Sequence, residues 1–317
     1  MRTMTYTATR PAVADPLHFR PVTLGAVDDI RRCLAIDPGR TCDYTVGGIY
    51  MWVDYFSYRY CIVRDTLFIQ GVSENDLSRT AYSMPVGRMS LAESVELLKR
   101  HCRSVGERLR FSAVPGDKLR QFEAIGHCDV VQLNDWSDYV YDAEALATQS
   151  GNQLKKKRNH FNRFMADNPG SELTPLTLDD VDDAKSLILT LAAADDEASP
   201  MASAERAQTV AVLDNWSVYS HVFEGGVLRD AAGRMVAFAI GEIIGDTLFV
   251  HIEKIDHSVA GAGETVNKLF AARITAMYPE VRYINREEDV GDPGLRAAKQ
   301  SYHPLMLLPK YNVSYRF

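Results

Sequence analysis

Five consecutive polar residues follow a short apolar segment near the end of the chain, and their types suit a binding or catalytic site. The sequence of 281–304 is VRYINREEDVGDPGLRAAKQSYHP. Its first four residues predict a buried strand, and the polar residues after the strand are Asn285, Arg286, Glu287, Glu288 and Asp289. In open α/β sheets, ligands bind at the carboxyl ends of the strands. We therefore predict a site at the end of this strand.

A short helix is predicted directly after these residues, over 295–300, and it carries Arg296 and Lys299. Either cation could hold a phosphate or a carboxylate. A plainer interpretation stays open, in which the whole segment is a solvated strand-to-helix loop. In that case Asp292 caps the helix and Pro293 occupies its first position.

A second group of suitable residues lies in the segment 249–255, FVHIEKI. The alternation of side chains along a strand places His251 and Glu253 on one face, together with Phe249. A histidine and a glutamate side by side in apolar surroundings can have shifted pKa values, as a general base requires. Two alternatives stay open: a hydrogen-bonded core histidine, and a structural ion pair of Glu253 with Arg286.

A basic helix is predicted over 154–167, where the sequence LKKKRNHFNRF crowds cationic side chains into about two turns. Lys156, Asn159 and Arg163 share one face of this helix, and Arg158 lies between them in the sequence. Like charges four residues apart destabilise a helix by a few tenths of a kcal/mol per pair. A partner with negative charge would relieve this repulsion, although a solvated basic face is also possible.

A glycine-containing turn, SVAGAG, is predicted at the entry of the helix that follows the histidine-bearing strand. Small residues at such a turn expose backbone N–H groups at a helix N-terminus, where anions bind. Gly261 and Gly263 are therefore candidate anion-binding positions. The alternative is an ordinary glycine-rich turn.

The composition limits the classes of function that fit the chain. It has 317 residues, of which 46% are hydrophobic and 24% charged, and a net charge of −7. A negative chain is not a general nucleic-acid or membrane binder, so an anionic partner requires a local basic patch. The sequence has neither an apolar stretch of transmembrane length nor a secretory signal pattern, and we expect a cytoplasmic protein.

The five cysteines are scattered over the first 128 residues without CxxC spacing, and this pattern supports neither a zinc site nor a disulfide framework. We expect reduced, mostly buried thiols. No set of residues has usable metal-ligand spacing, so we predict no metal.

Strand and helix patterns alternate through both halves of the chain, which is typical of α/β proteins. We predict two domains, 1–150 and 151–317, each a mixed twisted sheet flanked by helices. The second half is expected to contain a meander of strands at 218–223, 235–243 and 247–255. An aromatic-rich run, CDYTVGGIYMWVDYFSYRYCIV, is expected to pack in the core or to line a cleft.

The motifs KKKRNHFNRF, VHIEK, YINREEDVGDPGLRAAKQSYHP and PKY occur in this order between about 152 and 311. This ordered set resembles the family of the phosphatidylglycerol lysyltransferase C-terminal domain. The first half resembles the family more loosely, through CDYTVGGIYMW and SDYVYD. The resemblance implies two GNAT-type acyltransferase domains in tandem.

The resemblance also implies an acyl or aminoacyl transfer. The donor would be an aminoacyl-tRNA or an acyl-CoA, and the acceptor an unidentified hydroxyl or amine on a small molecule or a lipid headgroup. Two features differ from relatives of this kind. The sequence contains no membrane-embedded region, which argues against a lipid acceptor, and Ser258 stands where GNAT enzymes have Gln or Arg, which argues against CoA.

These considerations assign roles to the candidate residues. Glu253 or Glu287 is expected to be the base, in the vicinity of His251, and Tyr302 a possible acid. The remaining residues are expected to bind anionic groups or to complete the site: Lys156, Arg158, Asn159, Arg163, Gly261, Gly263, Asn285, Arg286, Glu288, Asp289, Arg296 and Lys299. No tightly bound cofactor is expected. The alternative function is a non-catalytic protein that binds RNA or a nucleotide-like ligand.

Overall fold

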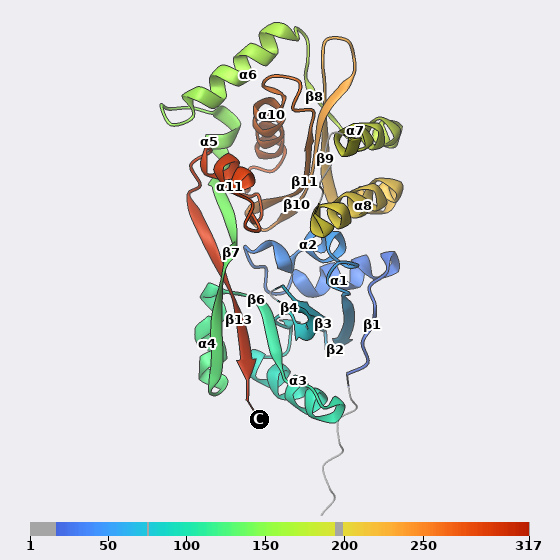
Figure 1. Cartoon of the computed structure of the whole chain (residues 1–317), viewed down its shortest axis with the longest axis vertical. Helices are drawn as coiled ribbons and strands as arrows, with labels where there is room; N and C mark the ends of the chain where they lie inside the picture. The colour runs from blue at the N-terminus through green and yellow to red at the C-terminus, as the bar shows by residue number, and fades with distance from the viewer. Residues whose placement is uncertain (1–16, 75, 194–198, 317) are drawn as a thin grey trace, which may run out of the picture.

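One mixed β-sheet runs through the whole molecule in the computed structural model, which describes residues 17–74, 76–193 and 199–316 (Figure 1). Within these residues the sheet has thirteen strands, in the order β1-β2-β3-β4-β6-β13-β7-β12-β11-β10-β9-β8, with β5 paired to β3. The predicted class, a mixed sheet flanked by helices, is confirmed. Residues 1–16 of the predicted first domain lie outside the described residues.

The strands of the first half are β1 (Arg20–Pro21), β2 (Arg59–Val63), β3 (Thr66–Ser73), β4 (Asp76–Tyr82), β5 (Val86–Gly87), β6 (Arg110–Pro115) and β7 (Cys128–Asp142). The C-terminal strand is β13 (Met306–Tyr315). The strands of the second half are β8 (Leu173–Pro175), β9 (Phe223–Arg229), β10 (Met235–Ile244), β11 (Thr247–Ile255) and β12 (Tyr283–Asn285).

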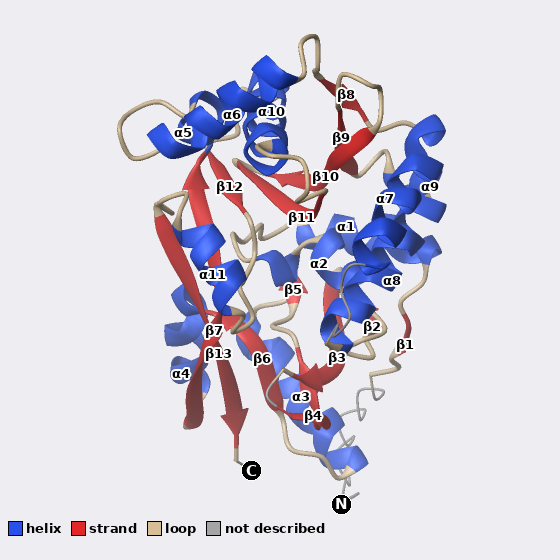
Figure 2. Ribbon diagram, turned by 45° about the horizontal axis from the view of Figure 1, so that its top comes forward, coloured by secondary structure: helices blue, strands red, loops and turns tan. Residues whose placement is uncertain are grey.

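The α-helices are α1 (Val27–Leu34), α2 (Val46–Met51), α3 (Leu91–Val105), α4 (Leu119–Ile125), α5 (Ala143–Thr148), α6 (Lys155–Asp167), α7 (Val181–Ala193), α8 (Pro200–Asp214), α9 (Trp216–Tyr219), α10 (Ala262–Met277) and α11 (Pro293–Gln300). In Figure 2, α5, α6 and α10 gather at one end of the molecule, and α7, α8 and α9 cover another side of the second half.

The two halves are joined through the strands β7 and β13. The C-terminal strand β13 is inserted between β6 and β7 of the first half, and β7 in turn pairs with β12 of the second half. The predicted division at residue 150 stays a prediction. The hydrogen bonding nevertheless shows that the last strand of the second half completes the sheet of the first, so residues on β7, β12 and β13 meet at one junction.

The strand β11 and the following α10 lead into β12, which pairs with β11 in parallel. Such a connection places the helix against one face of the sheet. The α10 side is filled by apolar residues that include Val250, Leu248, Val266 and Phe270. The opposite face of the same strands packs against α7 and α8, through residues that include Ile240, Ile252, Leu187 and Leu213.

The predicted alternation along β11 is wrong across His251. The register with β10 pairs Ile252 with Ile240 but Val250 with Gly241, which leaves His251 as an extra residue in a β-bulge. The bulge turns His251 toward α2, while Glu253 faces α10. Histidine and glutamate therefore lie on opposite faces of the sheet, which periodicity alone could not predict.

The predicted strand over 218–223 is also wrong, because Trp216–Tyr219 form the short helix α9 and β9 begins only at Phe223. The indole N–H of Trp216 donates to the backbone carbonyl of Leu176 at 3.2 Å, and the ring is buried. Burial of the aromatic side chains thus outweighs their strand propensity. The other two strands of the meander match the prediction closely.

Among residues 17–74, 76–193 and 199–316, no helix has both the length and the apolar character needed to cross a membrane.

The packing of α2 on β11 predicts a strong effect of substituting Gly47. A Cβ at this position would lie 2.1 Å from Cδ2 of His251, so we expect Gly47→Ala to destabilise the protein by about 1–3 kcal/mol. This clash outweighs the roughly 1 kcal/mol by which alanine favours a helix. Gly39→Ala is the control, since no described heavy atom lies within 4 Å of its added Cβ. Urea unfolding measures both variants, and equal stability of the two would contradict this packing.

Candidate functional site

The loop after β12 is the centre of the candidate site, because its polar side chains reach several different elements. Asn285 ends β12 and is buried. Its side-chain amide donates to the carboxylate of Asp138 on β7 and to the backbone carbonyl of Arg40, both at 2.7 Å. Its side-chain oxygen accepts from the backbone N–H of Glu287 at 2.7 Å. Asn285 therefore fixes the start of the loop against both halves of the molecule.

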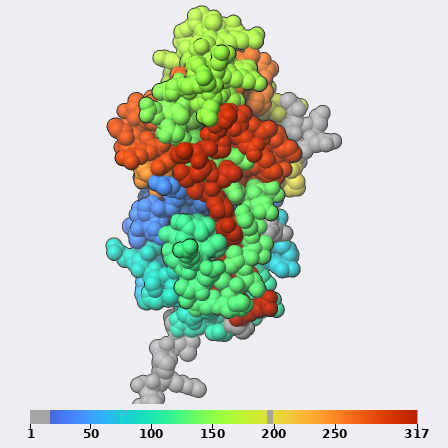
Figure 3. Space-filling view, turned by 90° about the vertical axis from the view of Figure 1, so that its left-hand side faces the viewer, coloured from blue at the N-terminus to red at the C-terminus, as the bar shows by residue number. Residues whose placement is uncertain are grey.

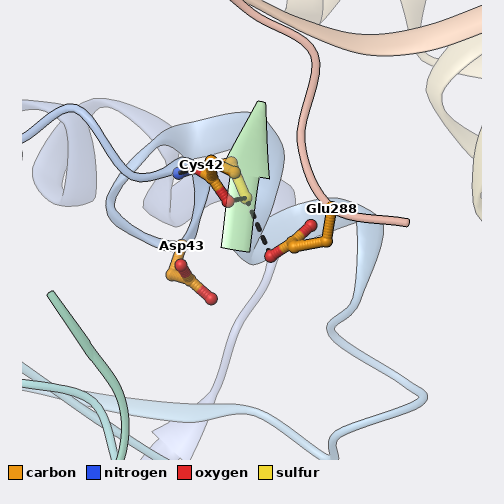
Figure 4. Close-up of side chains that lie close together, drawn as sticks. Cys42, Asp43 and Glu288 are labelled. Carbon is orange, nitrogen blue, oxygen red and sulfur yellow. Dashed lines mark hydrogen bonds between the residues drawn. The ribbon is translucent and has the colours of Figure 1, made fainter. Parts of the chain in front are cut away.

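Lys310, on β13, is fully buried among acidic groups at this junction. Its Nζ lies 2.6 Å from carboxylate oxygens of both Asp43 and Asp138, and it also contacts the carboxylate of Glu288. The Sγ of Cys42 lies 3.4 Å from the same nitrogen. Figure 4 shows Cys42 and Glu288 turned toward each other, with Asp43 beside them. We call these five residues the Lys310 cluster.

The Lys310 cluster contains one cation and three carboxyl groups, and burial determines how they hold protons. Burial raises the pKa of Asp43 to about 8 and also raises the pKa of Asp138, because the lysine offsets only part of the burial. For Glu288 the lysine outweighs burial and lowers the pKa. Burial raises the pKa of the Cys42 thiol well above its usual value, which disfavours the thiolate.

The Lys310 cluster also offers the residue types that bind metals. Single ligand atoms of Cys42, Asp43, Asp138 and Glu288 lie within 4.8 Å of one another. The ammonium of Lys310 contacts these same atoms, so it already balances part of their negative charge. The negative charge of the cluster is therefore balanced in part by Lys310, without a metal ion. The absence of a metal stays a prediction.

A second ionic arrangement is centred on His251, whose side chain is buried. Its Nδ1 lies 2.8 Å from a carboxylate oxygen of Glu287, and its Nε2 lies 3.5 Å from one of Glu242. Glu242 also accepts from the backbone N–H of Gly47 at 2.9 Å. Burial lowers the pKa of His251, but the two glutamates outweigh burial and raise it to about 9. His251 is therefore an imidazolium at neutral pH, which suits it to hold Glu287 rather than to accept a proton.

Glu287 combines an unusual backbone conformation with a shifted pKa. Its φ is 57°, in the left-handed region that is unfavourable for residues with a Cβ and that often marks functional sites. Burial raises the pKa of its carboxyl, and the imidazolium of His251 offsets this only in part. The side chain keeps 16% of its surface exposed. A carboxylate that is more basic than usual, oriented and accessible has the properties of a general base.

Glu253 belongs to a different group, on the α10 face of β11. It pairs with Arg286 at 2.9 Å and accepts from the side-chain amide of Asn267, on α10, at 3.0 Å. The guanidinium of Arg286 lies 5.0 Å from the ring centre of Tyr302, and the Nζ of Lys157 lies 4.1 Å from the same ring. Burial raises the pKa of Tyr302, so its hydroxyl stays protonated, as an acid requires.

Lys299 and Arg296, on α11, contact the loop itself. The buried Nζ of Lys299 donates to the backbone carbonyl of Arg286 at 2.6 Å and also to that of Glu288. Arg296 pairs with Asp289 at 2.7 Å. Both cations therefore hold the loop in place, and their binding of a substrate phosphate or carboxylate stays a prediction.

The predicted residues of the basic helix α6 lie at one end of the molecule (Figure 1). Lys156, Asn159 and Arg163 are exposed to solvent. Arg158 instead turns toward the preceding loop, where its guanidinium donates to the carbonyl of Gly151 at 3.1 Å. Three of the four residues are thus exposed, and one of them, Arg163, pairs with Asp167 at 3.6 Å within the helix.

The glycine turn before α10 lies under α6. Gly261 is buried with a φ of 83°, and a Cβ at this position would lie 2.4 Å from the carbonyl oxygen of His160 on α6. Ala262, the first residue of α10, is also buried. Gly263 packs more loosely, with an added Cβ at 3.2 Å from Ile255. Close packing of two helices therefore explains Gly261, and anion binding at this turn stays a prediction.

A cavity of about 590 Å³ lies at the junction of the two halves. Its walls come from both halves and include Arg40, Thr41, Asp246 and Pro309. Thr41 and Pro309 directly precede members of the Lys310 cluster in the sequence. The buried hydroxyl of Thr41 has no hydrogen-bond partner among the described residues. Neither Glu287 nor any member of the Lys310 cluster is among the residues that line the cavity.

Four residues of this site were not predicted from the sequence, namely Cys42, Asp43, Asp138 and Lys310. They lie in the motifs CDYTVGG, SDYVYD and PKY, which contributed to the family resemblance. These motifs could therefore have indicated the missed residues. No spacing rule connects residues that are separated by up to 268 positions in the chain.

Comparison with known proteins identifies similar chains. The family model described as "Phosphatidylglycerol lysyltransferase, C-terminal" matches residues 36–314. No curated protein matches the chain.

The chain is similar to a conserved protein of unknown function from Bacteroides thetaiotaomicron VPI-5482, with 30% identity, a TM-score of 0.84, and coverage of 95% of this chain and 100% of that one. It shares its fold with the C-terminal domain of a putative lysylphosphatidylglycerol synthetase from Agrobacterium fabrum, at 14% identity and a TM-score of 0.65, over 91% and 92% of the two chains. The structure of L-PGS from Bacillus licheniformis is similar at 12% identity and a TM-score of 0.62, over 90% of this chain and 91% of that one.

The contacts of His251 predict its titration. Because its pKa in the folded state is raised from 6.5 to about 9, its contribution to stability is complete below pH 6.5 and is lost as the pH rises through about 9. We expect NMR of the imidazole to show the protonated ring at pH 7. Glu287→Gln removes the partner at 2.8 Å and should lower this pKa by about one unit or more.

Glu253→Gln is the matched control for this titration, because Glu253 pairs with Arg286 and lies on the other face of β11. It should leave the pKa of His251 unchanged. A neutral imidazole at pH 7 in the unsubstituted protein would contradict the role of His251 as a cation that holds Glu287.

Proposed function

Because the chain belongs to the family of the phosphatidylglycerol lysyltransferase C-terminal domain, we propose that it transfers an aminoacyl group from an aminoacyl-tRNA to a hydroxyl or amine acceptor. The family and the fold support an acyl- or aminoacyltransferase of the GNAT-like type. The observation that carries the proposal is Glu287, a basic and accessible carboxylate in the loop after β12, held by a buried imidazolium.

Glu287 is the proposed general base. It takes the proton of the acceptor hydroxyl or amine while the acceptor atom attacks the carbonyl carbon of the aminoacyl ester. A new bond forms between the acceptor and this carbon, and the bond to the 3′ oxygen of the tRNA breaks. The proton on Glu287 then passes to the departing 3′ oxygen, so that the carboxylate is restored.

Two observations favour an aminoacyl-tRNA over an acyl-CoA as the donor. The N-terminal residues of α10 are buried under α6, which leaves Gly261 and Ala262 inaccessible to a pyrophosphate. The exposed side chains of Lys156 and Arg163 on α6 suit the longer anionic backbone of a tRNA.

The role of Glu287 predicts the effect of its substitution. We expect Glu287→Gln to lower the rate of transfer by about 10²–10⁴, the usual contribution of a general base. Transfer is followed as movement of a labelled amino acid from aminoacyl-tRNA into phospholipid or amine acceptors. Glu253→Gln should have a much smaller effect, because its carboxylate is occupied by Arg286 and Asn267. Full activity of Glu287→Gln would disprove the assignment.

The choice of donor predicts a difference in ligand-induced stabilisation. A donor that binds the native state at 100 times its dissociation constant adds about 2.7 kcal/mol to the free energy of unfolding. We expect aminoacyl-tRNA at low salt to raise the melting temperature and acetyl-CoA to leave it unchanged. A clear rise of the melting temperature with acetyl-CoA would instead indicate that the donor is a CoA thioester. Stabilisation by tRNA without any transfer would instead support a non-catalytic RNA-binding protein.

A further inference from the structure

The cavity at the junction of the two halves opens where two strands of the first half part. β4 and β6 are parallel neighbours, and among the described residues one pair alone, Tyr82 with Phe111, joins them. Beyond this pair the two segments separate, and Met84 and Pro115 line the cavity of about 590 Å³. Pockets that hold small organic ligands have volumes of about 300–1,000 Å³. The cavity is therefore large enough for such a ligand.

Tyr44 holds the two separated segments in place. Its buried hydroxyl accepts from the backbone N–H of Met84 at 3.2 Å and donates to the backbone carbonyl of Ala113, on β6, at 3.3 Å. One phenol thus bonds to backbone groups that a longer pairing of the strands would have satisfied. Ala113 has a φ of 53°, in the left-handed region that is unfavourable for a residue with a Cβ and that often marks functional sites. The opening between the strands is therefore maintained by specific contacts.

One polar group in the wall of the cavity lacks a partner. Thr41 lines the cavity and is only 3% exposed, and its hydroxyl has no hydrogen-bond partner among the described residues. A buried hydroxyl without a partner costs stability, and a ligand atom that bonds to it removes this cost. Much of the remaining wall is apolar and includes Tyr44, Met84, Leu308 and Pro309. A matching ligand therefore has an apolar body and a polar group that reaches Thr41.

The charged residues of the cavity leave one carboxylate without a cation. Arg40 pairs with Asp246 at 2.8 Å, and Lys118 pairs with Asp37 at 2.9 Å. The third aspartate, Asp117, is exposed, and no cation in the described part of the chain pairs with it. Complementary charge favours the binding of a ligand and like charge opposes it. The spare negative charge therefore favours a cation over an anion.

The wall of the cavity is bonded to the loop after β12. The backbone carbonyl of Arg40 accepts from the side-chain amide of Asn285 at 2.7 Å. Asn285 also accepts from the backbone N–H of Glu287, whose carboxylate lies 2.8 Å from Nδ1 of His251. Figure 3 shows atoms of the early part of the chain (blue) directly below atoms of the second half (orange). A ligand that shifts the segment at Arg40 therefore also shifts the loop.

We propose that this cavity is an effector site for a small amphipathic amine. The ammonium group of the ligand pairs with Asp117, its apolar body fills the interior, and a hydroxyl at its other end bonds to Thr41. Occupation of the site acts on the loop after β12 through Arg40 and Asn285. Binding and its effect on the loop require no transfer chemistry, so this inference goes beyond the proposed function and fails or holds independently of it.

Isothermal titration calorimetry of the full chain with tyramine tests the ligand chemistry. We expect tyramine to bind and para-hydroxyphenylpropionate, which has the same ring but a carboxylate, not to bind. Asp117→Asn should weaken the binding of both tyramine and phenethylamine about two- to fivefold, the usual effect of an exposed ion pair. Thr41→Val should weaken tyramine roughly two- to tenfold through the lost hydrogen bond, and it should leave phenethylamine, which has no hydroxyl, unchanged.

Asp179→Asn is the matched control, because Asp179 is an exposed aspartate that does not line the cavity. It should bind tyramine as the unsubstituted protein does. Thr41→Val should keep the melting temperature of the free protein, since its hydroxyl has no partner to lose. The ligand site is overturned if tyramine does not bind, if the carboxylate analogue binds as tightly, or if Asp179→Asn loses as much binding as Asp117→Asn.

The effect on the loop has a separate readout in the NMR signals of the His251 imidazole. We expect these signals to shift in proportion to the occupancy of the site during a titration with tyramine, because His251 contacts Glu287 in the loop. The same titration of Asp117→Asn should need a higher concentration of tyramine for the same shift. Unchanged His251 signals at saturation would overturn the effector role.

Discussion

The burial of Lys310 is the interaction on which the rest of the structure depends. Removal of an ammonium group from water costs several kcal/mol, and only close anionic partners can offset this cost. Here the partners come from three separate segments: Asp43 before α2, Asp138 on β7 and Glu288 after β12. None of these segments can move without leaving a buried charge unpaired. This cation therefore holds the junction of the two halves together with the pairing of β7, β12 and β13.

This constraint also positions the loop that contains the proposed base. Glu288 is held by Lys310, and Asn285 is held by Asp138, which is itself a partner of Lys310. Glu287 lies between these two residues and adopts a left-handed backbone conformation. A conformation of this kind costs on the order of 1–3 kcal/mol and persists only where the surroundings enforce it. The neighbouring contacts enforce it here, and they direct the carboxylate of Glu287 toward His251.

The same principle explains the orientation of α11. Its two cations are drawn inward because the loop presents the carboxylate of Asp289 and two backbone carbonyls that need donors. Once Arg296 and Lys299 face the protein, the remaining side of this eight-residue helix presents Leu295, the alanines at 297–298 and Gln300 to the outside. The exposure of Leu295 is thus a consequence of the way in which the candidate site is held together.

The sequence by itself determined the class of fold, the family, and the position of the central loop. These conclusions depend on local features: the apolar periodicity of strands and helices, the polar run after the strand, and ordered motifs, and the match over residues 36–314 confirms the family. Most of the helices near the site, including α6 and α10, were also predicted closely, since their amphipathic patterns are long.

Only the tertiary structure decided which of the polar residues act together. The bulge at His251 separates it from Glu253 and pairs it with Glu287. Lys310 meets Cys42 across 268 positions of the chain, and neither was predicted as part of the site. Periodicity describes neighbours along a strand or helix, whereas partners of a buried charge are chosen by which segments the folded sheet brings together. For that reason the sequence located the loop after β12, and the fold determined which of its side chains contact one another.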